Sequence, residues 1–263
     1  MSRPVSGTRE WAVASVNTVT GCSHDCRYCY AKYNACDRFK SITHEDWSNK
    51  KVRMTDVLKK RHKIDGGRVM FPTTHDICPD TLEPCITVIK NLLDVGNELL
   101  IVSKPHFVCI QEICGMFSDF KDKILFRFTI GSRDDMILKY WEPGAPCYAE
   151  RLASLSLAKI QGFSTSVSIE PMLDPSNVIS LVQSVYPDVT DSIWLGKMNN
   201  IEKRVKQETA EDREQVKRIV DGQTDDNIKK IYEKLKSNNK VRWKESIKDV
   251  LDLARPEEAG LDI

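Results

Sequence analysis

Three cysteines lie close together near the start of the chain, in the stretch Cys22-Ser-His-Asp-Cys26-Arg-Tyr-Cys29. Thiolates at this spacing can bind a single metal ion or three of the irons of a [4Fe–4S] cluster. A closed structural zinc site needs a fourth ligand, for which His24 or Cys36 is available. A cluster with three cysteine ligands instead leaves one iron open to a small molecule, which indicates catalysis. The spacing alone leaves both kinds of site open.

The rest of the composition is that of an ordinary globular chain of 263 residues, 41% hydrophobic and 29% charged, with a formal net charge of +1. This charge excludes a polybasic protein, although a local basic groove is compatible with it. The nine cysteines are odd in number and follow no charged-then-apolar leader. We therefore expect free thiols in the reducing cytoplasm rather than a disulfide framework. Apolar runs stay well short of the roughly 20 residues of a membrane span, so we expect no membrane partner.

Short apolar runs alternate with segments of helical spacing up to about Asn200. The strand candidates are 11–17, 68–71, 99–102, 124–130, 164–169 and 192–195, and helix candidates at 31–39, 81–95, 107–117, 146–160 and 177–186 follow the first five. Strict alternation of strand and helix predicts an α/β fold with a parallel sheet. Six units are too few for the closed eight-stranded barrel, so we predict a partial barrel.

Beyond Asn200 the chain is rich in charged residues, with apolar residues at helical spacing. This pattern predicts two or three amphipathic helices, the last over 243–253. We therefore divide the chain into a core of residues 1–200 and a helical C-terminal extension of residues 201–263.

The cysteine stretch, with Tyr28 directly before its last cysteine, resembles the signature of the radical S-adenosylmethionine (SAM) superfamily. The wider string from Asn17 to Ala31 is similar to that of spore photoproduct lyase and related phage-associated radical SAM proteins. The resemblance implies a partial (β/α)6 barrel of TIM type, with Cys22, Cys26 and Cys29 as ligands of a [4Fe–4S] cluster and SAM on its open iron. It also implies reduction of the cluster by a partner such as flavodoxin or ferredoxin, followed by SAM cleavage and abstraction of a hydrogen atom from a substrate.

The resemblance assigns further residues to the cofactor. Tyr28 matches the aromatic residue whose backbone contacts the adenine, and Lys104 matches a lysine that reaches the SAM carboxylate. Thr74, His75 and Asp76 match the stretch whose polar end holds the SAM amino group. The other candidates for cofactor contact stand at or just beyond the ends of the later strands: Thr129, Ser132, Arg133, Ser168, Leu195 and Gly196. Ordinary structural roles stay open for several of these, such as a packed ring for Tyr28, a helix cap for Asp76 and a solvent-exposed ion pair for Arg133.

Two residues are candidates for catalysis. Glu170 follows the fifth strand candidate, where it can face the SAM ribose or the substrate. The lyase family has a hydrogen-donating cysteine where this chain has Thr73, and a hydroxyl is a poor hydrogen-atom donor. Cys78 stands nearby in the sequence and is a candidate donor, with a buried inert thiol as the alternative. The departure at Thr73 argues against thymine-dimer lyase activity.

A basic and aromatic run follows the cysteines, formed by Tyr30, Tyr33, Arg38 and Lys40. Such residues suit base stacking and phosphate contact, although an ordinary helix surface has the same composition. Together with the resemblance, this run favours a nucleic-acid base or nucleotide as substrate. A peptide or small metabolite is the alternative within the superfamily. An alternative of another class is a metal-stapled nucleic-acid-binding module without catalysis.

Overall fold

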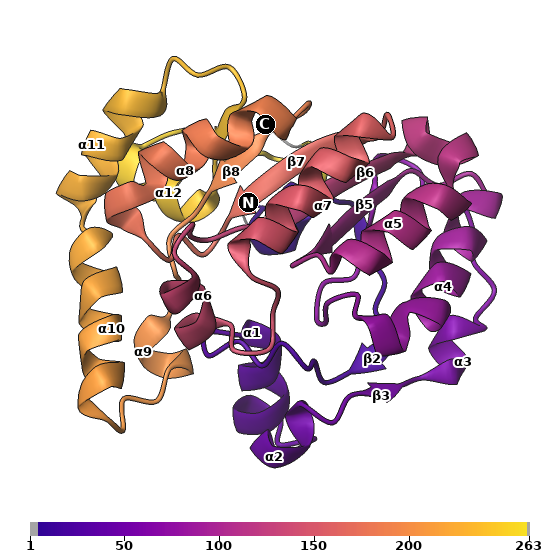
Figure 1. Cartoon of the computed structure of the whole chain (residues 1–263), viewed down its shortest axis with the longest axis horizontal. Coiled ribbons are helices and arrows are strands. Elements are labelled where there is room, and N and C mark those ends of the chain that lie inside the picture. The colour runs from indigo at the N-terminus through magenta and orange to yellow at the C-terminus, as the bar shows by residue number, and fades with distance from the viewer. Residues whose placement is uncertain (1–4, 262–263) are drawn as a thin grey trace.

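The computed structural model describes residues 5–261 and contains a seven-stranded parallel sheet in the order β1-β4-β5-β6-β7-β8-β9 (Figure 1). Its strands are β1 Ala14–Ser15, β4 Val69–Phe71, β5 Leu99–Ser103, β6 Ile124–Thr129, β7 Ser164–Ile169, β8 Ile193–Leu195 and β9 Val241–Trp243. Strands β1 and β9 form the two edges. The first six strands match the six strand candidates, so the predicted partial barrel is confirmed.

Side chains alternate between the two faces of the sheet, because successive residues of a strand point in opposite directions. The residues that pack under the helices include Phe71, Ile101, Phe126, Val167 and Leu195. The residues on the inner face include Met70, Leu100, Leu125 and Trp194. Arg127 also lies inside, where its guanidinium carbon is 4.7 Å from the centre of the Trp11 ring and 5.3 Å from that of Trp194. An arginine held between two indole rings therefore fills part of the barrel interior.

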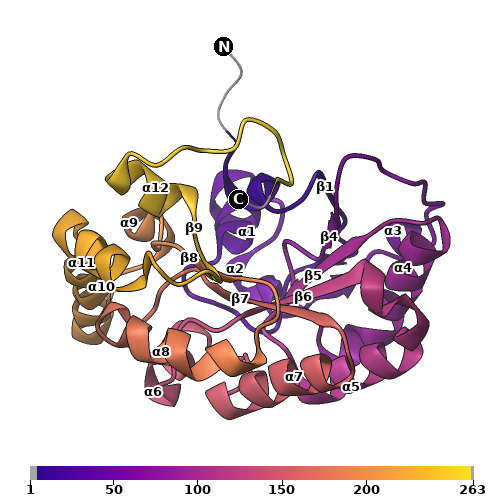
Figure 2. The ribbon, with the colours of Figure 1, turned by 90° about the horizontal axis from the view of Figure 1, so that it is seen from above.

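Helices cover the outer face of the sheet, as the view from above shows (Figure 2). They are α4 Leu82–Asp94, α5 Phe107–Met116, α7 Tyr148–Ile160 and α8 Val178–Val185, each close to the bounds that periodicity predicts. An additional helix, α6 Asp135–Trp141, lies between β6 and α7 and did not stand out in the sequence. Its apolar side chains pack with Val216 and Ile219 in a second, smaller core.

The segment between β1 and β4 lies at the end of the barrel where the parallel strands finish (Figure 1). It contains an antiparallel hairpin of β2 Val19–Thr20 and β3 Lys51–Val52. Its helices are α1 Tyr30–Lys32, which continues into a π-helical stretch Tyr33–Arg38, then α2 His44–Trp47 and α3 Met54–Val57. The helix expected over 31–39 is therefore present, with a widened second half.

The C-terminal part contains α9 Ile201–Arg204, α10 Ala210–Gly222, α11 Asp225–Leu235 and α12 Glu245–Leu251. The helix expected over 243–253 starts later, because residues 241–243 instead form β9 and pair with β8. Three residues are too few to show strand periodicity. β9 joins the C-terminal part to the sheet of the core. The division of the chain at residue 200 stays a prediction. Its two parts include residues 1–4 and 262–263, which lie outside the described residues. Among residues 5–261, no helix is long and apolar enough to span a membrane.

Candidate active site

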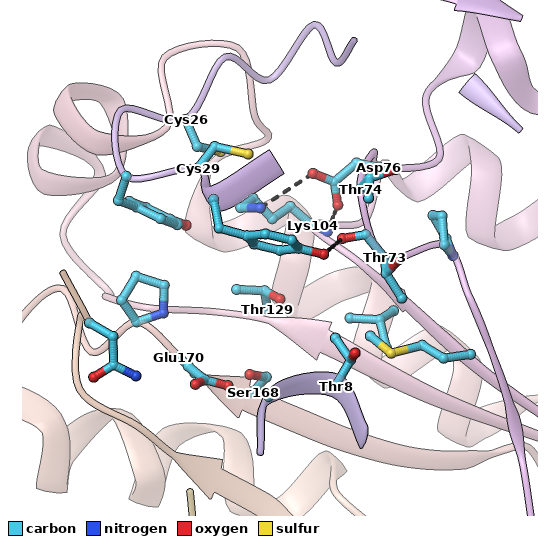
Figure 3. A pocket seen from close by; sticks show the side chains of 18 of the residues that line it. Thr8, Cys26, Cys29, Thr73, Thr74, Asp76, Lys104, Thr129, Ser168 and Glu170 are labelled. Carbon is cyan, nitrogen blue, oxygen red and sulfur yellow. Dashed lines mark hydrogen bonds and ion pairs between the residues drawn. The ribbon is translucent and has the colours of Figure 1, made fainter. Parts of the chain in front are cut away.

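A cavity of about 570 Å³ lies at the C-terminal ends of the parallel strands (Figure 3). Parallel sheets place their chemistry at this end, and the volume is in the range of small-molecule sites. Strands β4 to β9 all contribute residues at or just after their ends. These include Thr73, Thr74, His75, Asp76, Lys104, Thr129, Ser168, Glu170, Lys197 and Glu245.

The cysteine loop, residues 21–29, forms one end of the cavity, and all three of its cysteines line it. Cys22 and Cys26 are buried and Cys29 is half-buried. Burial raises the pKa of the Cys22 thiol to about 12 and also raises the pKa values of Cys26 and Cys29. Three thiolates here therefore need a compensating positive charge, which a bound metal supplies. The donor set fits an iron–sulfur cluster with three cysteine ligands.

The two candidates for a fourth zinc ligand have other partners. His24 points its Nδ1 at Asp76 and its Nε2 at His106. Cys36 donates to the carbonyl oxygen of Thr43 at 3.5 Å. Neither residue lines the cavity, and within residues 5–261 no fourth cysteine does. This arrangement favours the open cluster over a closed zinc site.

Close backbone contacts hold the cysteine loop in place. The Cys22 N–H donates to the Trp47 carbonyl at 2.9 Å, and the Arg27 N–H donates to the Trp141 carbonyl at 2.9 Å. A Cβ atom at Gly144 would lie 2.0 Å from the carbonyl oxygen of Ser23. Glycine is therefore required for the chain after α6 to pass this close to the loop.

Asp76 is the centre of a buried network behind the cysteines. Its Oδ1 accepts from the Lys104 N–H at 2.7 Å and from the Ser103 hydroxyl at 3.0 Å, and its Oδ2 accepts from His24 Nδ1 at 2.8 Å. Lys104 Nζ lies 3.3 Å from the same Oδ2. Burial opposes ionisation of Asp76, but Lys104 and His24 hold its pKa well below the usual range. Burial likewise opposes the charge of Lys104, but Asp76 raises its pKa well above the usual range. The cavity wall therefore carries a fixed ion pair.

Asn17 fixes the turn after β4. Its Oδ1 accepts from the N–H groups of Thr73 at 2.7 Å and Thr74 at 2.9 Å, and its Nδ2 donates to Thr73 Oγ1 at 2.7 Å. The Tyr30 hydroxyl donates to the Thr73 carbonyl at 2.7 Å (Figure 3). His75 lies on the same turn, and burial lowers its pKa to about 4, so its ring is neutral near pH 7. The asparagine of the motif thus ties the cysteine-loop segment to the turn that carries Thr73.

Tyr28 connects the cavity wall to a buried ion pair. Its hydroxyl donates to Glu142 Oε1, and Glu142 Oε2 lies 2.6 Å from Arg151 Nη1. Arg151 also donates to the carbonyls of Pro146 at 2.8 Å and Thr129 at 3.2 Å. Burial and the Glu142 carboxylate raise the pKa of Tyr28 well above its usual range. The phenol therefore points into the protein while the residue still lines the cavity.

The opposite wall carries acidic residues around one buried lysine. Lys244 Nζ lies 3.8 Å from a carboxylate oxygen of Glu170, 3.4 Å from one of Glu10 and 3.3 Å from one of Glu245, and it donates to the Gly7 carbonyl at 2.7 Å. Burial raises the pKa of Glu170, although Lys244 opposes this. Burial and the hydrogen bond to Glu245 raise the pKa of Glu10 to about 8. One ammonium is therefore shared by three carboxyl groups, and the raised pKa of Glu10 favours its protonated form.

The structure does not bring five of the predicted site residues to the cavity: Cys78, Ser132, Arg133, Leu195 and Gly196. Leu195 faces the outer helices because Trp194, next to it, faces inward. Gly196 packs directly against the side chain of Glu170, since a Cβ at this position would lie 2.9 Å from Glu170 Cγ. Cys78 is buried on the far side of Asp76, with its Sγ 3.6 Å from His24 Nε2.

Ser132 and Arg133 follow the end of β6, where the chain turns away from the cavity. The Ser132 hydroxyl accepts from the N–H of Asp134 at 3.0 Å. Arg133 donates to the hydroxyl of Ser180 in α8 at 3.0 Å. Both side chains stabilise the loop outside the cavity.

Several cavity residues were not predicted from the sequence: Thr8, Arg9, Lys197, Arg204 and Glu245. Arg204, at the end of α9, is half-buried, and its guanidinium makes no hydrogen bond or ion pair within residues 5–261. Burial lowers its pKa. In the sequence the charged members of this set look like ordinary solvent-exposed residues. Only the curvature of the barrel brings the five residues together.

No protein-family model matches the chain. Two uncharacterized proteins are 25% identical to it, one of Acidianus two-tailed virus over 178 residues and one of Methanocaldococcus jannaschii over 174 residues. The alignments cover 64% and 65% of this chain, and 58% and 65% of the respective relatives. The chain therefore spans less than two thirds of the length of these curated relatives.

Solved structures of SuiB share the fold, and a spore photoproduct lyase structure gives a weaker match. SuiB of Streptococcus suis bound to S-adenosylmethionine gives a TM-score of 0.52 at 9% identity, over 89% of this chain and 51% of SuiB. SuiB bound to its precursor peptide SuiA gives 0.55 at 8% identity, over 92% and 51%. A spore photoproduct lyase variant with a dinucleoside spore photoproduct gives 0.48 at 15% identity, over 82% and 63%.

The barrel and the superposition on SuiB define the class of fold: this is the partial barrel of the radical SAM enzymes. SuiB is an enzyme of that class. The fold that the cysteine motif implied is therefore confirmed.

Proposed function

We propose that the protein is a radical SAM enzyme in which Cys22, Cys26 and Cys29 hold a [4Fe–4S] cluster and the cavity binds SAM. One observation carries this proposal: the three thiols and the Asp76–Lys104 ion pair line the same cavity at the C-terminal ends of parallel strands. When bound, the cluster would supply the electron that cleaves SAM and so starts abstraction of a hydrogen atom from the substrate. Flavodoxin or ferredoxin is the proposed source of that electron.

The ion pair suits the amino-acid end of SAM, which carries an ammonium and a carboxylate. Lys104 uses part of its donor capacity on Asp76 and has further N–H groups for the SAM carboxylate. The contact of 3.3 Å between Asp76 Oδ2 and Lys104 Nζ can be exchanged for one with the SAM ammonium. Thr129 and Ser168, which lie along the cavity floor between this pair and Glu170 (Figure 3), add hydroxyl groups for the ribose.

The substrate side of the cavity favours a nucleic-acid base or nucleotide. Tyr30 lines it, and the cations Arg9, Lys197 and Arg204 lie around it. Aromatic rings and cations are the groups that stack bases and bind phosphate. A peptide is the alternative substrate, because the fold matches that of SuiB, which has been solved with a precursor peptide.

Anaerobic purification followed by a SAM-cleavage assay tests the proposal. We expect about four irons per chain, and 5′-deoxyadenosine after dithionite reduction, with turnover stimulated more by DNA, RNA or nucleotides than by peptides. The Cys22→Ala, Cys26→Ala and Cys29→Ala variants should lose iron and activity. Cys147→Ala, at an exposed cysteine, is the matched control and should retain both. A colourless protein that leaves SAM intact contradicts the proposal, and stimulation by peptides alone contradicts the substrate class.

A further inference from the structure

A second group of metal-binding side chains lies outside the cavity, on the other side of Asp76. It consists of His24, Cys78 and His106, and the candidate ligand atoms all lie within 4.8 Å of one another. His24 and Cys78 are 0% and 2% exposed, and His106 is half-buried. None of the three lines the cavity. They come from the cysteine loop, the chain after β4 and the chain after β5.

The spacing of these atoms is close to that around a tetrahedral metal ion. His24 Nε2 lies 3.6 Å from Cys78 Sγ and 2.9 Å from His106 Nε2. Zinc bond lengths imply about 3.6 Å between sulfur and nitrogen and about 3.3 Å between two nitrogens at a tetrahedral angle. The Cys78 sulfur is therefore already at the required distance from His24 Nε2, and the two imidazole nitrogens would need to move apart by about 0.4 Å.

Carboxylates face the outer nitrogen of both rings. Asp76 Oδ2 lies 2.8 Å from Nδ1 of His24, and Glu150 Oε1 lies 3.7 Å from Nδ1 of His106. A carboxylate favours the proton on Nδ1, which leaves the lone pair on Nε2. The two Nε2 atoms, 2.9 Å apart, share a proton when no metal is bound, and a metal ion bound between them would replace that proton. Histidines that bind metals in proteins almost always have such a partner on the outer nitrogen.

We propose that His24 Nε2, Cys78 Sγ and His106 Nε2 bind one zinc ion that is separate from the iron–sulfur cluster. One thiolate and two imidazoles at tetrahedral spacing suit Zn²⁺, and three protein ligands leave one position for water. The ion joins the cysteine loop to the turns after β4 and β5, and so fixes the orientation of the loop that carries Cys22 and Cys26. The link between these three segments does not depend on the SAM chemistry.

Metal analysis of the full chain, purified anaerobically without a histidine tag, tests this site. We expect about one zinc per chain in addition to the iron of the cluster. His106→Gln and Cys78→Ser should lose most of the zinc and keep at least half of the iron. His106→Gln changes a half-buried residue, so it reports on the site even where Cys78→Ser does not fold.

Matched variants separate this site from the cluster. His44→Gln, at an exposed histidine paired with Asp37, and Cys147→Ser, at an exposed cysteine, should keep their zinc. Replacement of Cys22, Cys26 and Cys29 by alanine should remove the iron and leave the zinc. Zinc K-edge X-ray absorption of the wild type should show one sulfur and two imidazole nitrogens.

Two results overturn the proposal. One is a wild-type protein that contains no zinc above the level of its His106→Gln variant, even after addition of ZnCl₂. The other is zinc that disappears with the three cluster cysteines but is retained in Cys78→Ser and His106→Gln. Since iron content and SAM cleavage are measured separately, a failure here is distinct from a failure of the proposed enzymatic function.

Discussion

Replacement of Arg151 by methionine tests whether the buried ion pair behind Tyr28 supports the cysteine loop. Arg151 and Glu142 are both fully buried, with 2.6 Å between Nη1 and Oε2. The variant leaves the Glu142 carboxylate in the interior without a counter-charge. Removal of one partner from a buried pair costs about 3–5 kcal/mol, which is a large share of the total stability of a domain. We expect the free energy of unfolding to fall by this amount.

The measurement is equilibrium urea unfolding, followed by circular dichroism, on anaerobic protein of matched iron content. Arg213→Met is the control, because the guanidinium of the exposed Arg213 donates to the carbonyls of Gln207 and Glu208, both at 3.2 Å, and has no ion-pair partner among residues 5–261. Its loss should change stability by about 0.5 kcal/mol or less. The double variant Arg151→Met/Glu142→Gln also removes the unpaired carboxylate charge. Its loss of stability should be about 1–3 kcal/mol smaller than the sum of the losses in the two single variants.

Two outcomes would refute the reasoning. If Arg151→Met costs no more than Arg213→Met, the pair contributes nothing beyond a surface arginine. If the two changes at Arg151 and Glu142 are simply additive, the interaction between them is not the source of the loss. Either result would remove the basis for a supporting role of this pair behind the cysteine loop.

Three further predictions concern the loop, the acidic wall and the cofactor. Gly144→Ala would bring a Cβ 2.0 Å from the Ser23 carbonyl oxygen, so it should lower the iron content and reduce the free energy of unfolding by about 1–3 kcal/mol. The control Gly115→Ala, where nothing lies within 4 Å of the added Cβ, should lower neither the iron content nor the stability. Equal iron contents in the two variants would contradict this prediction. In the unfolded chain the Glu10 carboxyl ionises near the ordinary glutamate pKa of 4.5, while in the folded protein it stays protonated up to a pKa of about 8, so stability should fall as pH rises between these values. Glu10→Gln should flatten that slope in urea midpoints; an unchanged slope would exclude Glu10 as its source. Asp76→Asn should weaken SAM binding about 10- to 100-fold in equilibrium dialysis, and unchanged affinity would argue against an ammonium contact there.

Much of the barrel could be predicted because its strands are apolar runs separated by helices of clear periodicity. Thr129 and Ser168 line the cavity because each lies near the end of a strand and faces inward. Leu195 does not line it. Ile193, Trp194 and Leu195 are all buried and apolar, so the sequence does not reveal which of them faces the interior. The direction of the chain beyond a strand is equally hard to predict. Ser132 and Arg133 stand only a few positions after Thr129, yet there the chain has already turned away from the cavity.

The rest of the site depends on contacts between distant parts of the sequence. Glu245 follows β9, a strand too short to recognise, and Arg204 lies in a segment whose charges look like ordinary surface. Thr8 and Arg9 precede the first strand. These residues meet only when the two edges of the sheet approach each other in the folded barrel, and such long-range geometry leaves no local pattern to find.

The contact between Lys244 and the Gly7 carbonyl has a consequence for the order of events during synthesis. The two residues are 237 positions apart, at nearly opposite ends of a chain of 263 residues. A ribosome releases the cysteine loop before Lys244, so the wall formed by Glu10, Glu170 and Lys244 can assemble only after residue 244 has emerged. The finished cavity therefore does not exist until residue 244 has been made. The cofactor binding proposed for that cavity would then follow the synthesis of all these residues, and the three thiols would have to remain reduced until it takes place.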